Sequence, residues 1–151
     1  MSGINLRTWG PIMLSVSVAL SVAAMTATGA IKARQHEMEG IRDEMKVLGA
    51  IAKKEQPFDA GVVQASAAKI ADHLATAADL FPEGSDAGDV ETLAKPEIWT
   101  DRATFDTTLE STRQAAVAMQ AVSSADAFPP ALGKLGNGCK TCHDLFREPK
   151  K

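Results

Sequence analysis

Apolar residues recur at every third or fourth position in four stretches of this chain, and that spacing predicts four amphipathic helices. The stretches cover residues 38–51, 63–81, 105–122 and 132–146. Prolines and turn-forming residues separate them, which indicates that each stretch is a helix of its own. Helices that each bury one apolar face pack against one another, so the pattern predicts an all-α protein built as an antiparallel four-helix bundle.

The N-terminus carries a different pattern, a run of 23 uncharged and mostly apolar residues at positions 9–31. As a helix this run would be about 34 Å long, enough to cross the hydrocarbon core of a bilayer. We therefore expect a transmembrane anchor over residues 1–31, followed by the helical domain over residues 32–151. A cleaved secretory signal with Arg7 as its basic region is the alternative.

Composition and charge narrow the classes of function. Without Arg7 the 16 basic side chains become 15, against 19 acidic ones, so the domain is acidic. That balance argues against a partner bound mainly through nucleic-acid phosphates. Two cysteines cannot form a disulfide-rich scaffold, and their role must be sought in their immediate neighbours.

The chemistry lies in the fourth stretch, where Cys139, Cys142 and His143 form a C-x-x-C-H motif. This motif is typical of c-type haem attachment, in which both thiols bond to the porphyrin and the adjacent imidazole binds the iron. On a helix the two cysteines are about one turn apart and the histidine follows on the same face. We expect one covalent haem c at these residues.

Other interpretations of the motif are weaker. A structural zinc site needs further ligands, and only His36 and His73 remain. A thioredoxin-like redox pair needs a strand, a helix and a second strand around it, and no strand pattern is present. Since bacteria attach haem c on the non-cytoplasmic side, we expect the domain in the periplasm and, with the anchor, the protein in the inner membrane.

The chain resembles the class II c-type cytochromes, the family of cytochrome c′ and the low-spin cytochromes c556. The likeness covers residues 32–148. Besides the haem motif it rests on four segments: 33–35 (Ala-Arg-Gln), 80–82 (Leu-Phe-Pro), 95–99 (Lys-Pro-Glu-Ile-Trp) and 146–147 (Phe-Arg). Most members of this family are soluble periplasmic proteins, so the expected anchor is a departure from the family.

The resemblance implies a role for Met38, three residues after Gln35. In cytochrome c′ the residue at this position covers the distal face of a five-coordinate iron that binds NO or CO. In the c556 group a methionine of the first helix is the sixth ligand. We expect a low-spin iron with Met38 as its distal ligand, because a thioether is a soft neutral donor that raises the reduction potential. The alternative is that Met38 only fills the core over an open iron.

Three further residues are candidates through the resemblance. Arg34 and Gln35 are similar to the family pair near a haem propionate, where a charge-assisted hydrogen bond is favourable. The alternative is a solvated helix face. Arg147 resembles the family arginine one turn after the proximal histidine, and the alternative is an exposed C-terminal cation that only complements the helix dipole.

These expectations combine into a membrane-anchored periplasmic electron carrier rather than an enzyme. Its partner is then a redox protein or a respiratory or photosynthetic membrane complex, and the resemblance leaves room for a homodimer. A cytochrome c′-like protein that binds NO or CO is one alternative. A structural or relay subunit of a larger electron-transfer complex is another.

Overall fold

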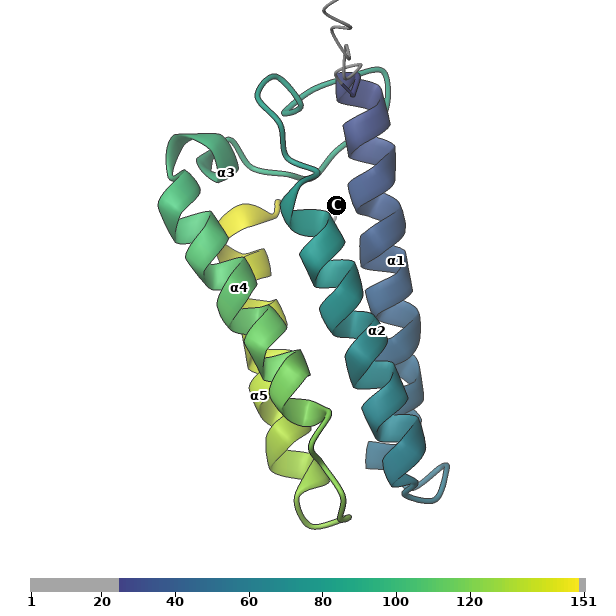
Figure 1. Ribbon diagram of the computed structural model, residues 1–151. Coiled ribbons are helices and arrows are strands. Elements are labelled where there is room, and N and C mark those ends of the chain that lie inside the picture. Colours follow the sequence, from purple (N-terminus) through teal and green to yellow (C-terminus); the bar gives the residue numbers. More distant parts are fainter. Residues whose placement is uncertain (1–24, 150–151) are drawn as a thin grey trace, which may run out of the picture.

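A computed structural model describes residues 25–149, which form four long helices and one short one (Figure 1). The long helices are α1 (Ala27–Ala52), α2 (Ala60–Ala78), α4 (Arg102–Met119) and α5 (Phe128–Phe146). The short helix α3 (Glu97–Thr100) is a single turn that leads into α4. The long helices run alternately up and down, which confirms the predicted all-α four-helix bundle.

Short polar side chains and prolines set the starts of the helices. Thr26 and Asp59 each accept a hydrogen bond from a backbone N–H in the first turn, at 3.1 and 3.0 Å. Helix α5 begins at Phe128, earlier than the predicted stretch. Pro129 and Pro130 occupy its first turn, where a missing N–H costs nothing, so the proline pair opens this helix instead of preceding it.

The predicted anchor over residues 1–31 lies mostly outside the described residues. Its last part belongs to the bundle, because α1 begins at Ala27 and because Ala30 and Ile31 are fully buried. Helix α1 thus begins before residue 32, where we expected the haem domain to start. Between residues 25 and 149, no helix has the length and apolar character needed to cross a membrane.

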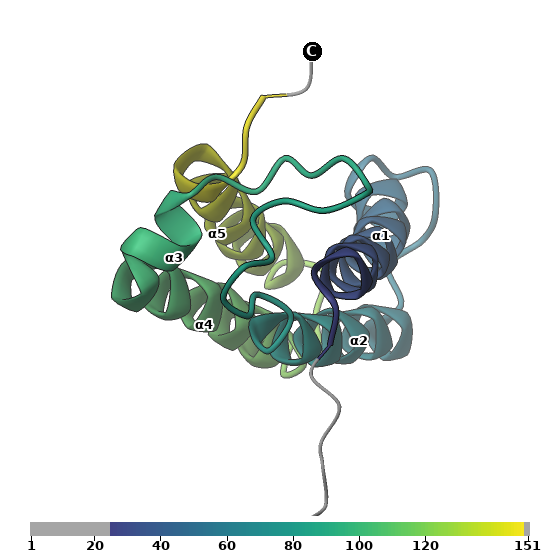
Figure 2. The ribbon, with the colours of Figure 1, turned by 90° about the horizontal axis from the view of Figure 1, so that it is seen from above.

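The helices pack directly along three edges of the bundle: α1 on α2, α2 on α4, and α4 on α5. Within the described part of the chain no comparable packing joins α1 to α5. Seen from above, the segment between α2 and α3 passes over the end of the bundle, across the interval that separates α1 from α5 (Figure 2). This fourth edge is therefore organised by the connecting segment and not by helix packing.

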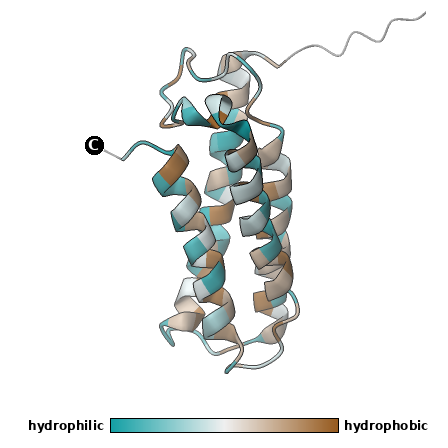
Figure 3. Cartoon of the chain, turned by 90° about the vertical axis from the view of Figure 1, so that its left-hand side faces the viewer, coloured by the Kyte–Doolittle hydropathy of each residue, from teal (hydrophilic) through white to brown (hydrophobic). Residues whose placement is uncertain are grey.

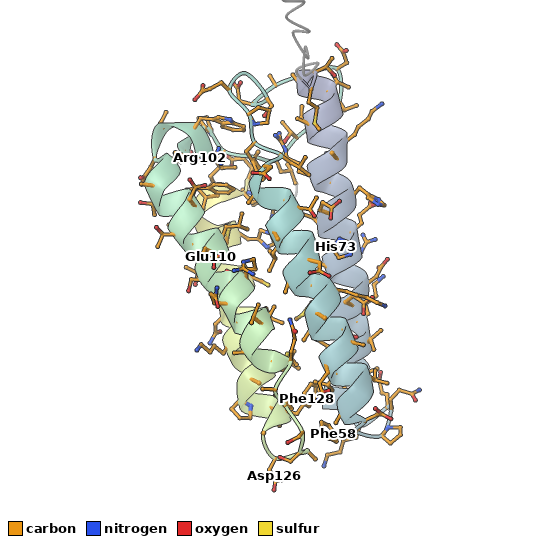
Figure 4. The ribbon with its side chains drawn as sticks, viewed as in Figure 1. Phe58, His73, Arg102, Glu110, Asp126 and Phe128 are labelled. Carbon is orange, nitrogen blue, oxygen red and sulfur yellow. The ribbon has the colours of Figure 1, made fainter. Side chains whose placement is uncertain are left out.

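Helices α1 and α2 come close together at Gly40, where any Cβ would overlap the imidazole of His73. The Nδ1 atom of His73 lies 2.6 Å from the Oε2 atom of Glu37, so a polar pair also joins the two helices. Figure 4 shows His73 on α2, beside α1. Close packing and this pair fix the position of α1, which forms one wall of the site described below.

Apolar and polar positions alternate along every helix, as the colours of Figure 3 show. The apolar positions form one core, in which Leu48, Ile70, Met119 and Leu135 are almost inaccessible to solvent. At the end away from the connecting segment, the rings of Phe58 and Phe128 pack with centroids 5.9 Å apart (Figure 4). The bundle is thus sealed at one end, and any internal space lies toward the other.

Candidate haem-binding site

A cavity of about 540 Å³ lies at the fourth edge of the bundle, between α1 and α5, which we call the open edge. Helices α1, α3, α4 and α5 and the segment between α2 and α3 supply its walls. Six buried apolar side chains form much of its surface: Ile41, Phe81, Ile98, Phe105, Leu109 and Phe146. A space of this size with an apolar lining is typical of a site for a cofactor or a small ligand.

Helix α5 brings the three residues of the C-x-x-C-H motif to this cavity. Cys139 and Cys142 are free thiols, partly buried against the core. Burial raises the pKa of Cys139, and burial together with the neighbouring thiol raises the pKa of Cys142 to about 11. Both cysteines are therefore protonated near neutral pH, unlike the low-pKa cysteine of a disulfide oxidoreductase.

Gly138 allows α5, which forms the wall with the haem motif, to pack closely against α4. A Cβ at Gly138 would stand 2.9 Å from Oγ1 and 3.3 Å from Cα of Thr112. Thr112 is buried on α4, and its backbone cannot yield easily. The glycine directly before Cys139 is thus required by helix packing, as much as by any approach of a porphyrin.

His143 follows the cysteines and lines the same cavity. Burial lowers the pKa of its imidazole, and the charge of Arg147 lowers it further, although Asp144 acts in the opposite direction. The neutral imidazole is the form that binds iron. The surroundings of His143 therefore favour the protonation state that a haem ligand requires.

The chain just after His143 is fastened to the segment between α2 and α3. Ala94 and Arg147 form an isolated antiparallel bridge, in which the N–H of Lys95 donates to the carbonyl of Phe146 at 3.0 Å. The N–H of Glu148 donates to the carbonyl of the residue before Ala94 at 2.8 Å. The end of α5 and one wall of the cavity are thus held as a unit.

Helix α1 places Met38 in the wall across from the haem motif. The structure brings Met38 and His143 to one cavity, as expected, and this placement suits both a distal ligand and a distal cover. Met45, two turns further along the same face, lines the cavity as well. Its seven-residue spacing from Met38 within the apolar stretch 38–51 was the signal in the sequence, and that spacing predicts only an inner helix face.

The structure directs Arg34 toward the connecting segment. Only 4% of this residue is exposed, so the alternative of a solvated helix face is wrong for it. Its Nη1 donates to Ser85 Oγ at 3.1 Å, and its Nη2 donates to the Ser85 carbonyl at 2.8 Å and to Thr92 Oγ1 at 3.0 Å. Gln35, which is exposed, donates to the carbonyl of Glu91 at 2.8 Å. Both residues line the cavity and hold the segment across its end.

The residues fit a haem c better than a bare metal ion. Two thiols and an imidazole lie on one helix beside an apolar cavity, as covalent attachment and axial ligation require. Throughout residues 25–149, no three His, Cys, Asp or Glu side chains are grouped so that they could hold a metal ion by themselves. The porphyrin would therefore supply most of the iron's ligands.

Comparison with known proteins gives the same answer. The family model described as cytochrome C′ matches residues 29–147. Cytochrome c′ of Rhodopseudomonas palustris is 39% identical over 129 residues, which are 84% of this chain and 87% of that protein. Cytochrome c-556 of Agrobacterium fabrum is 33% identical and covers 87% of this chain and 89% of its own length. A solved structure of cytochrome c′ from Rhodopseudomonas palustris has a TM-score of 0.76, is 34% identical, and covers 81% of this chain and 98% of its own.

These relatives correct one prediction. The inner-membrane location is wrong, because the matching proteins are soluble periplasmic cytochromes c′. The family match begins at residue 29, inside the run that was expected to cross the membrane. For the end of that run there is a physical cause: Ala30 and Ile31 are apolar because they are buried in the bundle, and the hydropathy pattern alone cannot distinguish that burial from burial in lipid.

Proposed function

The chain belongs to the cytochrome c′ family, and on that premise we propose that it carries one haem c and binds a small gas such as NO or CO at the distal side of the iron. The observation that carries this proposal is that Cys139, Cys142 and His143 line the same cavity as Met38. The similarity to cytochromes c′ from several bacteria supports the distal binding role.

Each group of residues has a part in this function. When bound, haem c supplies an iron centre that can accept an electron or an axial ligand. Cys139 and Cys142 would hold it covalently, and neutral His143 would be its proximal ligand. The apolar walls exclude water, and Met38 would limit which molecules reach the distal side. Neither gas binding nor electron transfer requires turnover of a substrate.

Electron transfer is the second candidate function, and Met38 is the observation that favours it. A thioether in the wall across from His143 suits a sixth ligand, and two axial ligands that persist in both redox states keep reorganisation small. Cytochromes c-556 are among the proteins that this chain resembles. In this role the partner would be a redox protein that docks near the cavity.

Optical spectra of the oxidised and reduced protein, with and without CO, distinguish the two functions. For a gas-binding protein we expect a high-spin ferrous spectrum and rapid CO binding without any mutation. An electron carrier would show a sharp low-spin α band and little CO binding, and Met38→Ala would make it five-coordinate and reactive toward CO. Met45→Ala is the matched control, because it shortens the neighbouring methionine of the same cavity wall.

A further inference from the structure

Three arginines line the cavity, and the structure gives them different tasks. A haem that occupies this site brings two carboxylates, which need cations or hydrogen-bond donors near the mouth. The charged or titratable side chains that line the cavity come from α1, from α5 and from the residue that follows α5: Arg34, Glu39, Arg42, Cys139, Cys142, His143 and Arg147. The residues of α4 and of the connecting segment that line it are uncharged. The carboxylates must therefore find their cation among the three arginines.

Arg34 is already committed to the protein. Its two terminal nitrogens make three hydrogen bonds of 3.1 Å or less to Ser85 and Thr92, and its guanidinium lies 4.9 Å from the centre of the Phe81 ring. To reach a carboxylate it would have to break these contacts and leave the buried acceptors unpaired, which is costly. Arg34 is a positioning residue, which acts on the haem site through the segment that it holds.

Arg147 stands on the histidine side of the cavity. Its backbone forms the bridge to Ala94, and its charge acts on the imidazole of His143. This position suits an influence on the proximal ligand. Since Arg147 lies on the histidine side, a cation on the opposite wall has to come from α1.

Arg42 lies two turns after Arg34 on the cavity-lining face of α1, with 58% of its side chain exposed. Its one contact with an acidic side chain is weak: Nε lies 3.4 Å from Oδ1 of Asp43. Lys46 holds that same oxygen at 2.8 Å, and Asp43 depends mainly on Lys46. The guanidinium of Arg42 can therefore turn to a ligand without leaving a carboxylate alone.

We propose that Arg42, and not Arg34, pairs with a haem carboxylate at the mouth of the cavity. This inference rests on the proposed function and adds the residue that orients the cofactor. Arg42 also offsets Glu39, whose carboxylate lines the cavity three residues earlier and would repel a ligand of the same charge. The flat, forked guanidinium suits a carboxylate at the solvent boundary.

The test is the pH dependence of the haem midpoint potential in the holoprotein. A neighbouring cation lowers the pKa of a carboxylate, so its loss moves the pH-dependent step of the potential to higher pH. For Arg42→Gln we expect an upward shift on the order of half a pH unit or more. Arg42→Lys should keep most of the unmutated behaviour, since it retains the charge. Lys53→Gln is the matched control, because it removes an exposed cation at the C-terminal end of α1 that does not line the cavity, and it should leave the step in place.

The outcomes separate the inference from the proposed function. Arg34→Gln should lower the melting temperature, because it releases the connecting segment, and it should move the step less than Arg42→Gln does. A step that does not move in Arg42→Gln, or that moves only in Arg34→Gln or Arg147→Gln, would overturn the assignment to Arg42. A purified protein with no covalent haem would instead overturn the proposed function itself.

Discussion

Two edges of this bundle are built from different residues and behave differently. Along α2 and α4 the helices pack directly, and their buried faces contain many small side chains: Ser66, Ala67, Ala71, Ala77, Ala115 and Ala116. Along α1 and α5 the helices do not pack in this way, and long or reactive side chains such as Met38, Met45 and Cys142 line a cavity. Small residues let two helices close on each other, whereas the other edge leaves room for a cofactor.

The open edge is bounded by contacts that do not depend on helix packing. Arg34 holds the connecting segment to α1, and the bridge between Ala94 and Arg147 holds it to the end of α5. At the other end of the bundle, Phe58 and Phe128 close the interior. A ligand in the cavity therefore meets walls that are already in place.

The first prediction removes the covalent attachment at the open edge and has the largest expected effect. In the double variant Cys139→Ser and Cys142→Ser, the denatured protein should lose all haem absorbance on a gel, because no thiol remains to bond to the porphyrin. Thr141→Ala is the matched control, since this exposed residue lies between the two cysteines. Haem that acidic organic solvent extracts from the unmutated protein would contradict covalent attachment.

The second prediction concerns the edge where α2 packs on α4, which we call the packed edge. Leu74 is 4% exposed and lies with Leu109 between α2 and α4. Leu74→Ala should lower the free energy of unfolding by about 3 kcal/mol, because the transfer free energy of the side chain is lost and a cavity remains. Denaturant titration of the holoprotein measures this loss. Val62→Ala on the same helix is exposed and should cost less than about 0.5 kcal/mol. Equal losses would show that the edge is not held by packing.

The comparison of the two edges also shows what the sequence could establish. The spacing of apolar residues was enough to predict the bundle, because each buried face repeats with the period of a helix. The haem motif could be found because its three residues are close together in the sequence. The cavity could not be foreseen, since periodicity assigns a residue to an inner face without showing whether that face meets a helix or a space. Met38 and Leu48 share one apolar stripe, yet Met38 lines the cavity and Leu48 is fully buried in the core.

Contacts between distant segments were the second limit. The partners of Arg34 are Ser85 and Thr92, which lie in a loop that has no periodic pattern. Likewise, nothing near His73 in the sequence indicates its pairing with Glu37 across two helices. Such pairs depend on how helices are placed in space, and a single sequence contains no signal for that placement.

The third prediction weakens the end of the open edge. Arg34→Ala leaves several acceptors of the connecting segment without their donor, so we expect a loss of about 2 kcal/mol in the free energy of unfolding. Arg102→Ala is the control from the packed edge, because Arg102 donates to the carbonyl of Phe81 in the connecting segment and to that of Ala78 at the end of α2. Its side chain is 43% exposed, and its loss should cost about 1 kcal/mol or less. A larger loss of unfolding free energy in Arg102→Ala than in Arg34→Ala would show that α4, and not α1, holds the connecting segment in place.

The smallest expected effect lies on the outer surface of the packed edge, at Glu110 of α4 (Figure 4). Hydrogen bonds from Arg113 and then from Gln114 lower the pKa of Glu110 to about 2 from its usual value of 4.5. Because the folded pKa is lowered, the pair stabilises the protein fully above about pH 4.5, and the contribution is lost as the pH falls toward 2. The melting temperature of Glu110→Gln should therefore lie slightly below that of the unmutated protein at pH 5, and the difference should vanish near pH 2.

Salt provides the control for this last prediction. Glu110 is solvent-exposed and Arg113 is partly exposed, so about 1 M salt should reduce the difference at pH 5 by screening the two charges. A difference between Glu110→Gln and the unmutated protein that is the same at every pH would show that the carboxylate acts through its shape and not its charge. If Glu110→Gln lowered the melting temperature as much as Leu74→Ala does, surface charge, and not packing between α2 and α4, would hold this edge together.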